Sequence, residues 1–339
     1  MTTVLAINPG SSSLQAELVD GEPVLDRAES ESELYSLLEH DIDAVGHRLV
    51  HGGAELLTPT VVDDSVVELV RDACSLAPLH VPVSLKLLIA LRERLPDVPH
   101  VVCPDTAFHR DLPEVAATWA LPESWRARFR LRRYGFHGLS YKWVTSRVGE
   151  QNVLAAHLGG GSSVCAIKDG RSVDTSMGFT PLDGVPMTKR SGSIDPGLVL
   201  WLIEQGLSLD EVRDGLYRES GLLGLSGGLS SDTRELVASD DPKAAFALDV
   251  FAHRIRRELA AMAASLERVD AVVFTGEIGW DQPEVREAVC SGLGVLGISG
   301  GLSGNRETDG LVSQDGAVPV YVVEPRENLQ ICRDTLAAL

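Results

Sequence analysis

The feature that most constrains the fold is a strand–turn–strand pattern that occurs twice. In the first copy, the apolar run at 4–7 breaks at Asn8-Pro9-Gly10 into three serines, and apolar alternation resumes up to residue 18. In the second copy, the run at 153–156 breaks into a glycine- and serine-rich turn at 157–163 and resumes at 164–166. The repetition predicts two structurally related halves, each opening with a β-hairpin whose turn presents backbone N–H groups.

Between and after these hairpins, helical periodicity alternates with short apolar runs, which predicts an α/β fold. Helices are expected at 65–76, 83–95, 198–205 and 242–266 and at the C-terminus, and strands at 100–103, 271–274 and 318–323. No low-complexity linker divides the chain, so we expect the domain boundary near residues 110–130.

The amino-acid composition argues against several classes of function and of site. The 339 residues include 30 Lys and Arg against 49 Asp and Glu, a net charge of −19, which argues against a binder of nucleic acid or anionic membranes. The five cysteines are scattered without a CxxC pair, so neither a disulfide framework nor a zinc site is expected. With no export signal or long apolar run, a cytoplasmic location is expected.

At three strand ends, the sequence predicts turns that could bind phosphate groups. They lie at 8–13, 157–163 and 274–279, and none matches a Walker A loop. One such turn alone is more often a plain turn, but three at strand ends favour a nucleotide cleft built from backbone donors.

Cationic residues stand out in so acidic a chain. Arg48 follows a buried-looking strand and Arg190 lies in a Gly/Pro-rich turn, so both are predicted to bind anionic oxygens. Arg132 and Arg133 end a run of alternating arginines and are predicted to be solvated. Asp105 and Glu327 each follow a strand and a proline turn, which suits metal binding, although Asp105 could equally cap a helix.

Taken together, these motifs resemble the acetate kinase family, the acyl-phosphate-forming branch of the superfamily that includes sugar kinases, actin and heat-shock ATPases. The resemblance runs along nearly the whole chain, and the segments that carry it are 8–13, 47–53, 76–80, 105–109, 133–140, 174–182, 190–192, 194–197 and 230–232. The chain is shorter than a typical member, mostly between the first hairpin and His47.

The resemblance implies in-line transfer of the ATP γ-phosphoryl group to a short carboxylate, giving an acyl phosphate and ADP. It implies that Asn8 and Glu327 hold Mg²⁺, that Arg48 binds the substrate carboxylate, that Asp105 is an essential acid, and that His137 and Arg190 stabilise the transferring phosphoryl group. The acyl pocket would be lined by Val50, Leu79, Phe136 and Pro181. Nucleotide contacts would come from Ser11, Ser13, Gln15, His157, Leu158, Gly159, Gly160, Gly161, Asp232, Thr233, Arg234, Glu277, Ile278, Gly279, Trp280 and Asp281.

The resemblance also implies two domains of ribonuclease H-like, actin-like ATPase topology around a central nucleotide cleft. We expect residues 1–115 with the C-terminal helix 328–339 in the first domain and 116–327 in the second, which would also form a homodimer. The expected partners are a short-chain carboxylate and a nucleotide, with no nucleic acid or membrane.

The departures from the family pattern cluster around the nucleotide. Gln15 replaces a lysine, Gly160 an asparagine and Thr233 an aromatic residue, and the sequence TGEIGWD at 275–281 differs from the family's TAGIGEN. Three hypotheses follow: an ATP-dependent carboxylate kinase with weakened nucleotide affinity, the same chemistry with another donor such as pyrophosphate, or a non-catalytic relative with a binding or regulatory role.

Overall fold

The computed structural model describes residues 2–10, 14–315 and 317–339, which form two compact units. Unit 1 comprises Met1–Arg110, Phe136–Trp143 and Arg326–Leu339, and unit 2 comprises Asp111–Gly135 and Val144–Pro325. Each unit contains one six-stranded sheet. Within the described residues, no helix has the length and apolar character needed to cross a bilayer.

The sheet of unit 1 has the order β3-β2-β1-β4-β6-β5. Strands β1, β2 and β3 pair antiparallel, whereas β4 is parallel to both β1 and β6. Their bounds are β1 Thr3–Pro9, β2 Leu14–Asp20, β3 Val24–Ala28, β4 Ala44–Leu49, β5 Thr60–Val61 and β6 His100–Pro104.

The sheet of unit 2 repeats this arrangement in the order β11-β12-β10-β7-β8-β9. Again three strands pair antiparallel in succession, and the first of them lies parallel to the next strand inward. The bounds are β7 Asn152–Leu158, β8 Ser162–Lys168, β9 Arg171–Thr175, β10 Ala271–Thr275, β11 Gly310–Leu311 and β12 Val320–Val322. The shared strand order confirms the prediction of two related α/β halves.

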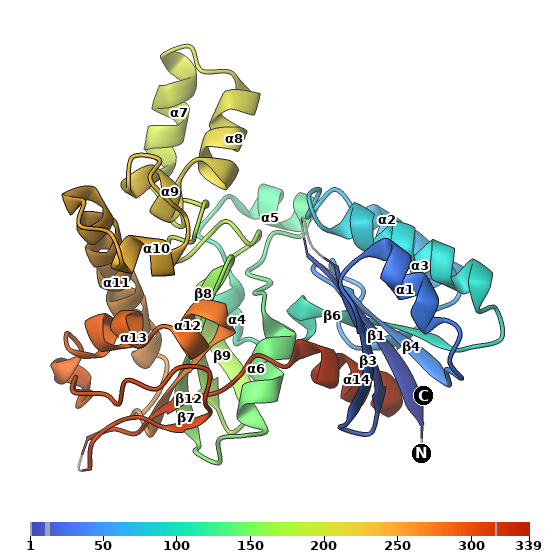
Figure 1. The fold of residues 1–339 in the computed structure, drawn as a ribbon. Helices are drawn as coiled ribbons and strands as arrows, with labels where there is room; N and C mark the ends of the chain where they lie inside the picture. Colours follow the sequence, from blue (N-terminus) through green and yellow to red (C-terminus); the bar gives the residue numbers. More distant parts are fainter. Residues whose placement is uncertain (1, 11–13, 316) are drawn as a thin grey trace. The chain divides into compact units, whose positions relative to one another are not determined.

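Helices cover both faces of the first sheet (Figure 1). Val45 and Leu49 of β4 pack into cores with α1 Glu31–Leu37, α2 Asp64–Ala73 and α3 Val81–Arg94. The opposite face meets α14 Glu327–Ala338: a Cβ added to Gly46 would lie 2.2 Å from Thr335 Oγ1. Because side chains alternate along a strand, Arg48 shares the α14 face with Gly46.

Unit 2 is built around α11 Pro242–Ala263, which packs against β7 and β8 through Phe251, Ile255 and Leu259. The other helices of this unit are α4 Glu114–Ala117, α5 Glu123–Phe129, α7 Pro196–Glu204, α8 Leu209–Arg218, α9 Gly221–Leu225, α10 Thr233–Val237, α12 Gly276–Asp281 and α13 Pro283–Cys290, with a 3₁₀ turn at Gly294–Leu296.

The unit boundaries differ from the expected 115/116 and 327/328. Residues 136–143, expected in the second domain, belong to unit 1, and the chain passes into unit 2 within α6 Gly138–Thr145. The physical reason is close packing: a Cβ on Gly138 would lie 2.0 Å from the Asp105 carbonyl oxygen, and the Tyr141 ring lies 5.9 Å from that of His109. Residues 111–115 belong to unit 2, and 326–327 to unit 1.

Candidate active site

A cluster of four polar side chains, here called the Arg48 cluster, lies in unit 1 and consists of Asn8, Arg48, Asp105 and Glu327. Arg48 donates to Asp105 Oδ2 from Nε (3.0 Å) and Nη2 (2.7 Å), and to Asn8 Oδ1 from Nη1 (2.8 Å). Glu327 Oε2 lies 3.7 Å from Arg48 Nη1 and accepts a hydrogen bond from Asn8 Nδ2 at 3.3 Å. Thus four residues predicted to act on substrate or metal are in direct contact.

The pleat of the sheet explains why these residues meet. Leu5 and Ile7 of β1 enter the α1–α3 side of the core, so Asn8 lies on the α14 face with Arg48. Helix α14 begins at Glu327, directly over these strands, and Asp105 follows β6 at the same sheet edge. Asp105 is the first residue of the 3₁₀ helix Asp105–His109, but its carboxylate binds Arg48, so the capping alternative is wrong.

Burial makes the charges of this cluster strongly interdependent. Burial acts to lower the pKa of the Arg48 guanidinium, but the Asp105 and Glu327 carboxylates outweigh it and raise that pKa above its ordinary value. Burial raises the pKa of the Asp105 carboxyl, with Arg48 opposing and Glu327 adding to the rise. Asp105 Oδ1 is buried without a hydrogen-bond partner. Within the cluster, two carboxylates therefore lie against one guanidinium.

Four other residues predicted to belong to the site, His137, Phe136, Val50 and Leu79, are also part of unit 1. His137 is buried and takes a left-handed backbone conformation (φ 58°), which is strained for a residue with a Cβ. Phe136 is buried with its ring edge-on to His51, at 5.4 Å between centroids. Val50 is buried and Leu79 half-buried. The roles of all four stay predictions.

In unit 2 the structure brings Arg190 and Pro181 together. Arg190 Nη1 donates to the Pro181 carbonyl oxygen at 3.0 Å and lies 3.6 Å from Met187 Sδ. Arg190 is half-buried, while Pro181 is buried. The predicted phosphoryl-stabilising arginine is therefore anchored on a predicted acyl-pocket residue.

The turn at His157-Leu158-Gly159-Gly160-Gly161 lies beside the start of α12 in unit 2. Gly276 has φ 78°, and a Cβ on it would lie 2.5 Å from the Leu158 carbonyl oxygen. A Cβ on Gly159 would lie 3.6 Å from the Glu277 amide nitrogen, whereas one on Gly160 would meet nothing within 4 Å. Two of the predicted nucleotide segments are therefore adjacent, and position 160 faces open space.

Helix α12 is fixed by residues that the sequence analysis did not identify. Trp280 Nε1 donates to Asp309 Oδ1 at 3.1 Å, which settles the orientation of this indole. Arg286 is fully buried and donates from Nη1 to the carbonyl oxygens of Gly279 (3.0 Å) and Trp280 (2.8 Å). The Asp281 carbonyl oxygen accepts from Arg306 Nη1 at 2.8 Å. The sequence did not point to these two arginines, because nothing in the neighbouring residues links them to so short a helix.

The remaining nucleotide predictions are spread over both units. Asp232 caps α10 by accepting from the Arg234 amide at 2.8 Å, and Thr233 is buried. Gln15 is exposed on β2, in register with Asn8, and so shares the face of the Arg48 cluster. Ser11 and Ser13 lie outside the described residues.

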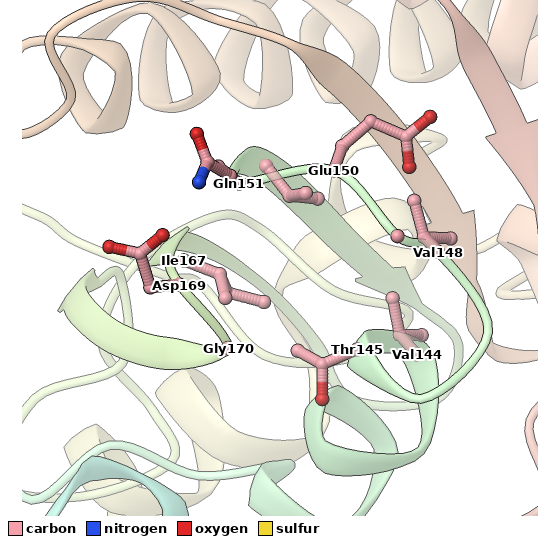
Figure 2. Close-up of a pocket in the computed structure, with 10 residues that line it drawn as sticks. Val144, Thr145, Val148, Glu150, Gln151, Ile167, Asp169 and Gly170 are labelled. Atoms are coloured by element: carbon pink, nitrogen blue, oxygen red, sulfur yellow. The ribbon is translucent and has the colours of Figure 1, made fainter.

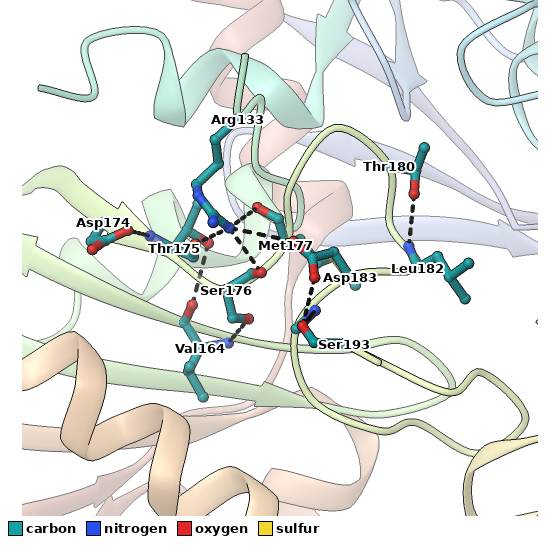
Figure 3. A network of polar contacts seen from close by, with 11 residues as sticks. Arg133, Val164, Asp174, Thr175, Ser176, Met177, Thr180, Leu182, Asp183 and Ser193 are labelled. Atoms are coloured by element: carbon teal, nitrogen blue, oxygen red, sulfur yellow. Dashed lines mark hydrogen bonds and ion pairs between the residues drawn. The ribbon is translucent and has the colours of Figure 1, made fainter. Parts of the chain in front are cut away.

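Arg133 corrects an expectation. It was predicted to be solvated, but its side chain is 20% exposed and donates to three successive backbone carbonyl groups in unit 2 (Figure 3). Of the arginines before it, Arg128 and Arg130 are exposed, whereas Arg126 and Arg132 are half-buried.

A cavity of about 240 Å³ lies elsewhere in unit 2 (Figure 2). It is lined by residues of α6, the 148–151 loop, β7, β8 and the turn to β9, including Val144, Glu150, Ile167 and Asp169. These positions lie at the opposite end of the hairpin from the 157–161 turn, and no predicted site residue lines the cavity.

Comparisons with known proteins place these observations in a family. The acetokinase family model matches residues 24–333. The chain is 45% identical over 318 residues to an acetate kinase of Leifsonia xyli subsp. xyli, covering 90% of this chain and 80% of that protein. It is also 45% identical over 310 residues to an acetate kinase of Deinococcus radiodurans, covering 87% and 78%.

Solved structures agree with the sequence matches. A propionate kinase from Francisella tularensis superposes with a TM-score of 0.92 at 30% identity, covering 100% of both chains. The Porphyromonas gingivalis acetate kinase superposes with a TM-score of 0.90 at 32% identity, again over 100% of both chains. From the sequence matches and these superpositions together, we conclude that the chain belongs to the acetokinase family.

Proposed function

We propose that this protein is an ATP-dependent carboxylate kinase that transfers the γ-phosphoryl group of ATP to acetate or another short-chain acid, reversibly, giving an acyl phosphate and ADP. Membership of the acetokinase family supports the reaction class. The single observation that carries the proposal is the Arg48 cluster, in which a guanidinium, two carboxylates and an amide meet on one sheet face.

Arg48 is equipped to receive the acceptor carboxylate. Asp105 and Asn8 engage three of its five N–H groups, and two remain for the two oxygens of a substrate. Because Asp105 and Asn8 hold the guanidinium on three sides, it is oriented before substrate arrives. The apolar part of the acid would pack on Val50, Leu79, Phe136 and Pro181.

Arg190 and His137 would stabilise the transferring phosphoryl group. In phosphoryl transfer, charge spreads over the equatorial oxygens, so catalysis depends on positioning and on fixed positive charge. The hydrogen bond from Arg190 Nη1 to the Pro181 carbonyl oxygen holds the guanidinium next to a residue that is predicted to line the acyl pocket. The acceptor carboxylate oxygen would attack the γ-phosphorus directly, with ADP leaving and no phosphoenzyme formed.

The Arg48 cluster also fits magnesium. It holds two carboxylates against one guanidinium, and Asp105 Oδ1 is buried without a partner, which leaves an excess of oxygen ligands. Mg²⁺ characteristically binds through one or two carboxylates together with substrate phosphates. Asn8 and Glu327 would hold the ion, which would neutralise charge on the phosphate oxygens when bound.

The backbone of unit 2 would supply much of the nucleotide contact. The turn at 157–161 and the adjacent start of α12 offer amide groups, whose donors do not depend on side-chain identity. This explains how phosphate binding could persist with Gly160 in place of asparagine. Gln15 is different, because the loss of a lysine there removes a charge-assisted contact worth about 1.5–3 kcal/mol.

The test is acyl-phosphate formation, trapped as the hydroxamate, with Mg²⁺, a panel of short carboxylates, and ATP, GTP or pyrophosphate as donors. Turnover with ATP supports the proposal. Turnover only with pyrophosphate or GTP would show remodelled donor loops, and a folded protein with no turnover for any pair would favour a non-catalytic role. An Arg190→Ala variant that kept full turnover would overturn the role given to Arg190, and Arg128→Ala serves as its control.

We also propose that the protein is a cytoplasmic homodimer that associates through α7. Helix α7 lies beside α8 (Figure 1). No residue of α7 is buried: Leu200 and Trp201 are 63% and 53% exposed, and Leu209 at the start of α8 is 63% exposed. Large contiguous apolar patches mark interaction sites. Sedimentation analysis should give a dimer for wild type and a monomer for Trp201→Glu; a wild-type monomer would contradict the proposal.

The proposed cytoplasmic location rests on the cysteines: all five are free, which suits a reducing compartment.

A further inference from the structure

Arg133 fixes the backbone at the end of β9. Its Nη1 donates to the carbonyl oxygens of Thr175 (2.9 Å), Ser176 (3.0 Å) and Met177 (3.3 Å), as Figure 3 shows. The guanidinium also lies 4.6 Å from the Trp119 ring centroid and 3.7 Å from Asp183 Oδ2. Three successive carbonyl dipoles thus converge on one cation.

That convergence determines the local conformation. Carbonyl oxygens that point toward one another repel, so residues 175–177 need the cation to keep this geometry. The backbone of the next residue, Gly178, is tightly packed: a Cβ on Gly178 would lie 2.5 Å from Asp183 Oδ2 and 2.6 Å from the Trp119 ring. The Gly178 carbonyl oxygen in turn accepts from the Tyr134 amide at 3.0 Å.

The other end of the same segment carries two predicted site residues. Residues 175–193, here called the acceptor segment, contain Pro181 and Arg190, which are joined by a 3.0 Å hydrogen bond. Asp183 Oδ1 accepts from Ser193 Oγ at 2.5 Å, and the Ser193 amide donates to the Gly184 carbonyl at 2.8 Å. The Met187 amide donates to the Arg190 carbonyl at 3.0 Å. The contacts of Arg133 and Asp183 and the contacts of Arg190 therefore lie in one short segment and are joined through the backbone between Pro181 and Asp183.

We propose that Arg133 is a positioning residue for the reaction: by holding the carbonyl groups of 175–177 together with Asp183, it sets where the acceptor segment presents Pro181 and Arg190. This inference rests on the proposed carboxylate kinase function. In this proposal, Arg133 does not contact the substrate. A displacement of catalytic groups by about 1 Å can cost about 10²-fold in rate, so a residue that only fixes backbone can control turnover.

The test compares Arg133→Ala, Arg133→Lys and the control Arg128→Ala, an exposed arginine on α5 whose guanidinium lies over Phe129. Steady-state kinetics would be measured for carboxylate and ATP separately. We expect Arg133→Ala to lower kcat about 10²-fold and to raise the carboxylate KM about tenfold, with an unchanged ATP KM. Lysine keeps a cation with three donors, so Arg133→Lys should recover most of both constants.

Hydrogen exchange gives a readout that does not need activity. In Arg133→Ala the amides of Tyr134, Met187 and Ser193 should exchange faster, while those of β7 and β10 stay protected. Arg133→Ala with unchanged kinetic constants, or with kcat reduced only in proportion to the folded fraction, would overturn the proposal. Wild-type protein without turnover would instead overturn the proposed function, and exchange rates in the acceptor segment would still decide whether Arg133 fixes it.

Discussion

The Arg48 cluster in unit 1 and the phosphate turns in unit 2 use different chemistry. In the Arg48 cluster, charged side chains orient one another, and loss of Arg48 would leave two carboxylates without their shared guanidinium. In the turn at 157–161 and the start of α12, backbone geometry forms the surface, and only positions that need glycine constrain the sequence. This explains why the acceptor residues match the family pattern while the nucleotide residues have diverged.

The largest expected effect comes from breaking the Arg48–Asp105 pair. Arg48→Gln removes both the acceptor contact and the partner of a buried carboxylate, so we expect turnover to fall by about 10³-fold or more and stability by about 3–5 kcal/mol. Turnover assays and urea unfolding measure the two effects. Asp105→Asn, similar in shape, should cost comparable activity but less stability; equal stability losses would contradict the buried-charge argument.

Two glycines of unit 2 sharpen the contrast. Gly276→Ala should cost about 1–3 kcal/mol, because position 276 combines a left-handed backbone with a 2.5 Å approach to the Leu158 carbonyl. Gly160→Ala, in open space, should stay within about 0.5 kcal/mol of wild type. Urea unfolding compares them directly, and a Gly160→Ala protein as unstable as Gly276→Ala would show that backbone geometry is not the deciding factor.

Gln15→Lys tests whether nucleotide affinity was lost through one charge. The new ammonium would lie on the strand face that carries Asn8, and a charge-assisted bond to phosphate should lower the ATP KM about tenfold or more. The carboxylate KM should not change. Gln15→Met is the matched control, since it has comparable length without charge, and an equal improvement with methionine would refute the explanation.

Two buried histidines of unit 1, His47 and His100, should make the stability of the protein depend on pH. Burial, reinforced by His100, holds the pKa of His47 well below its usual value, and burial also lowers the pKa of His100. As pH falls below about 6.5, the unfolded chain takes up protons that the folded chain refuses, so stability decreases by up to about 1.4 kcal/mol per pH unit for each histidine. Urea unfolding between pH 7.5 and 5.5, with His47→Gln as the flatter control, measures it; equal slopes would contradict this origin.

The sequence predicted the two hairpins and the α/β class, and it singled out Arg48 and Asp105 separately as candidate site residues, because strand ends and alternation are local signals. It did not predict that these two side chains contact each other. It misplaced Arg133, since alternation of the preceding arginines is equally typical of a solvated face. It also gave no sign of Asp309 or Arg286 near α12, because their contacts depend on how distant loops fold back. The sequence alone therefore pointed to the candidate reactive groups but not to the residues that hold the surrounding backbone in place.

The three-segment construction of unit 1 has a consequence for how the protein is made. Every residue of unit 2 leaves the ribosome before Arg326–Leu339, whose helix α14 covers β1, β4 and β6 and begins with Glu327. The first sheet must therefore wait, with one face bare, until the later unit has been synthesised, reversing the usual order in which N-terminal domains finish first. A nascent chain stalled before residue 326 would hold Arg48 and Asp105 without the carboxylate that completes their cluster.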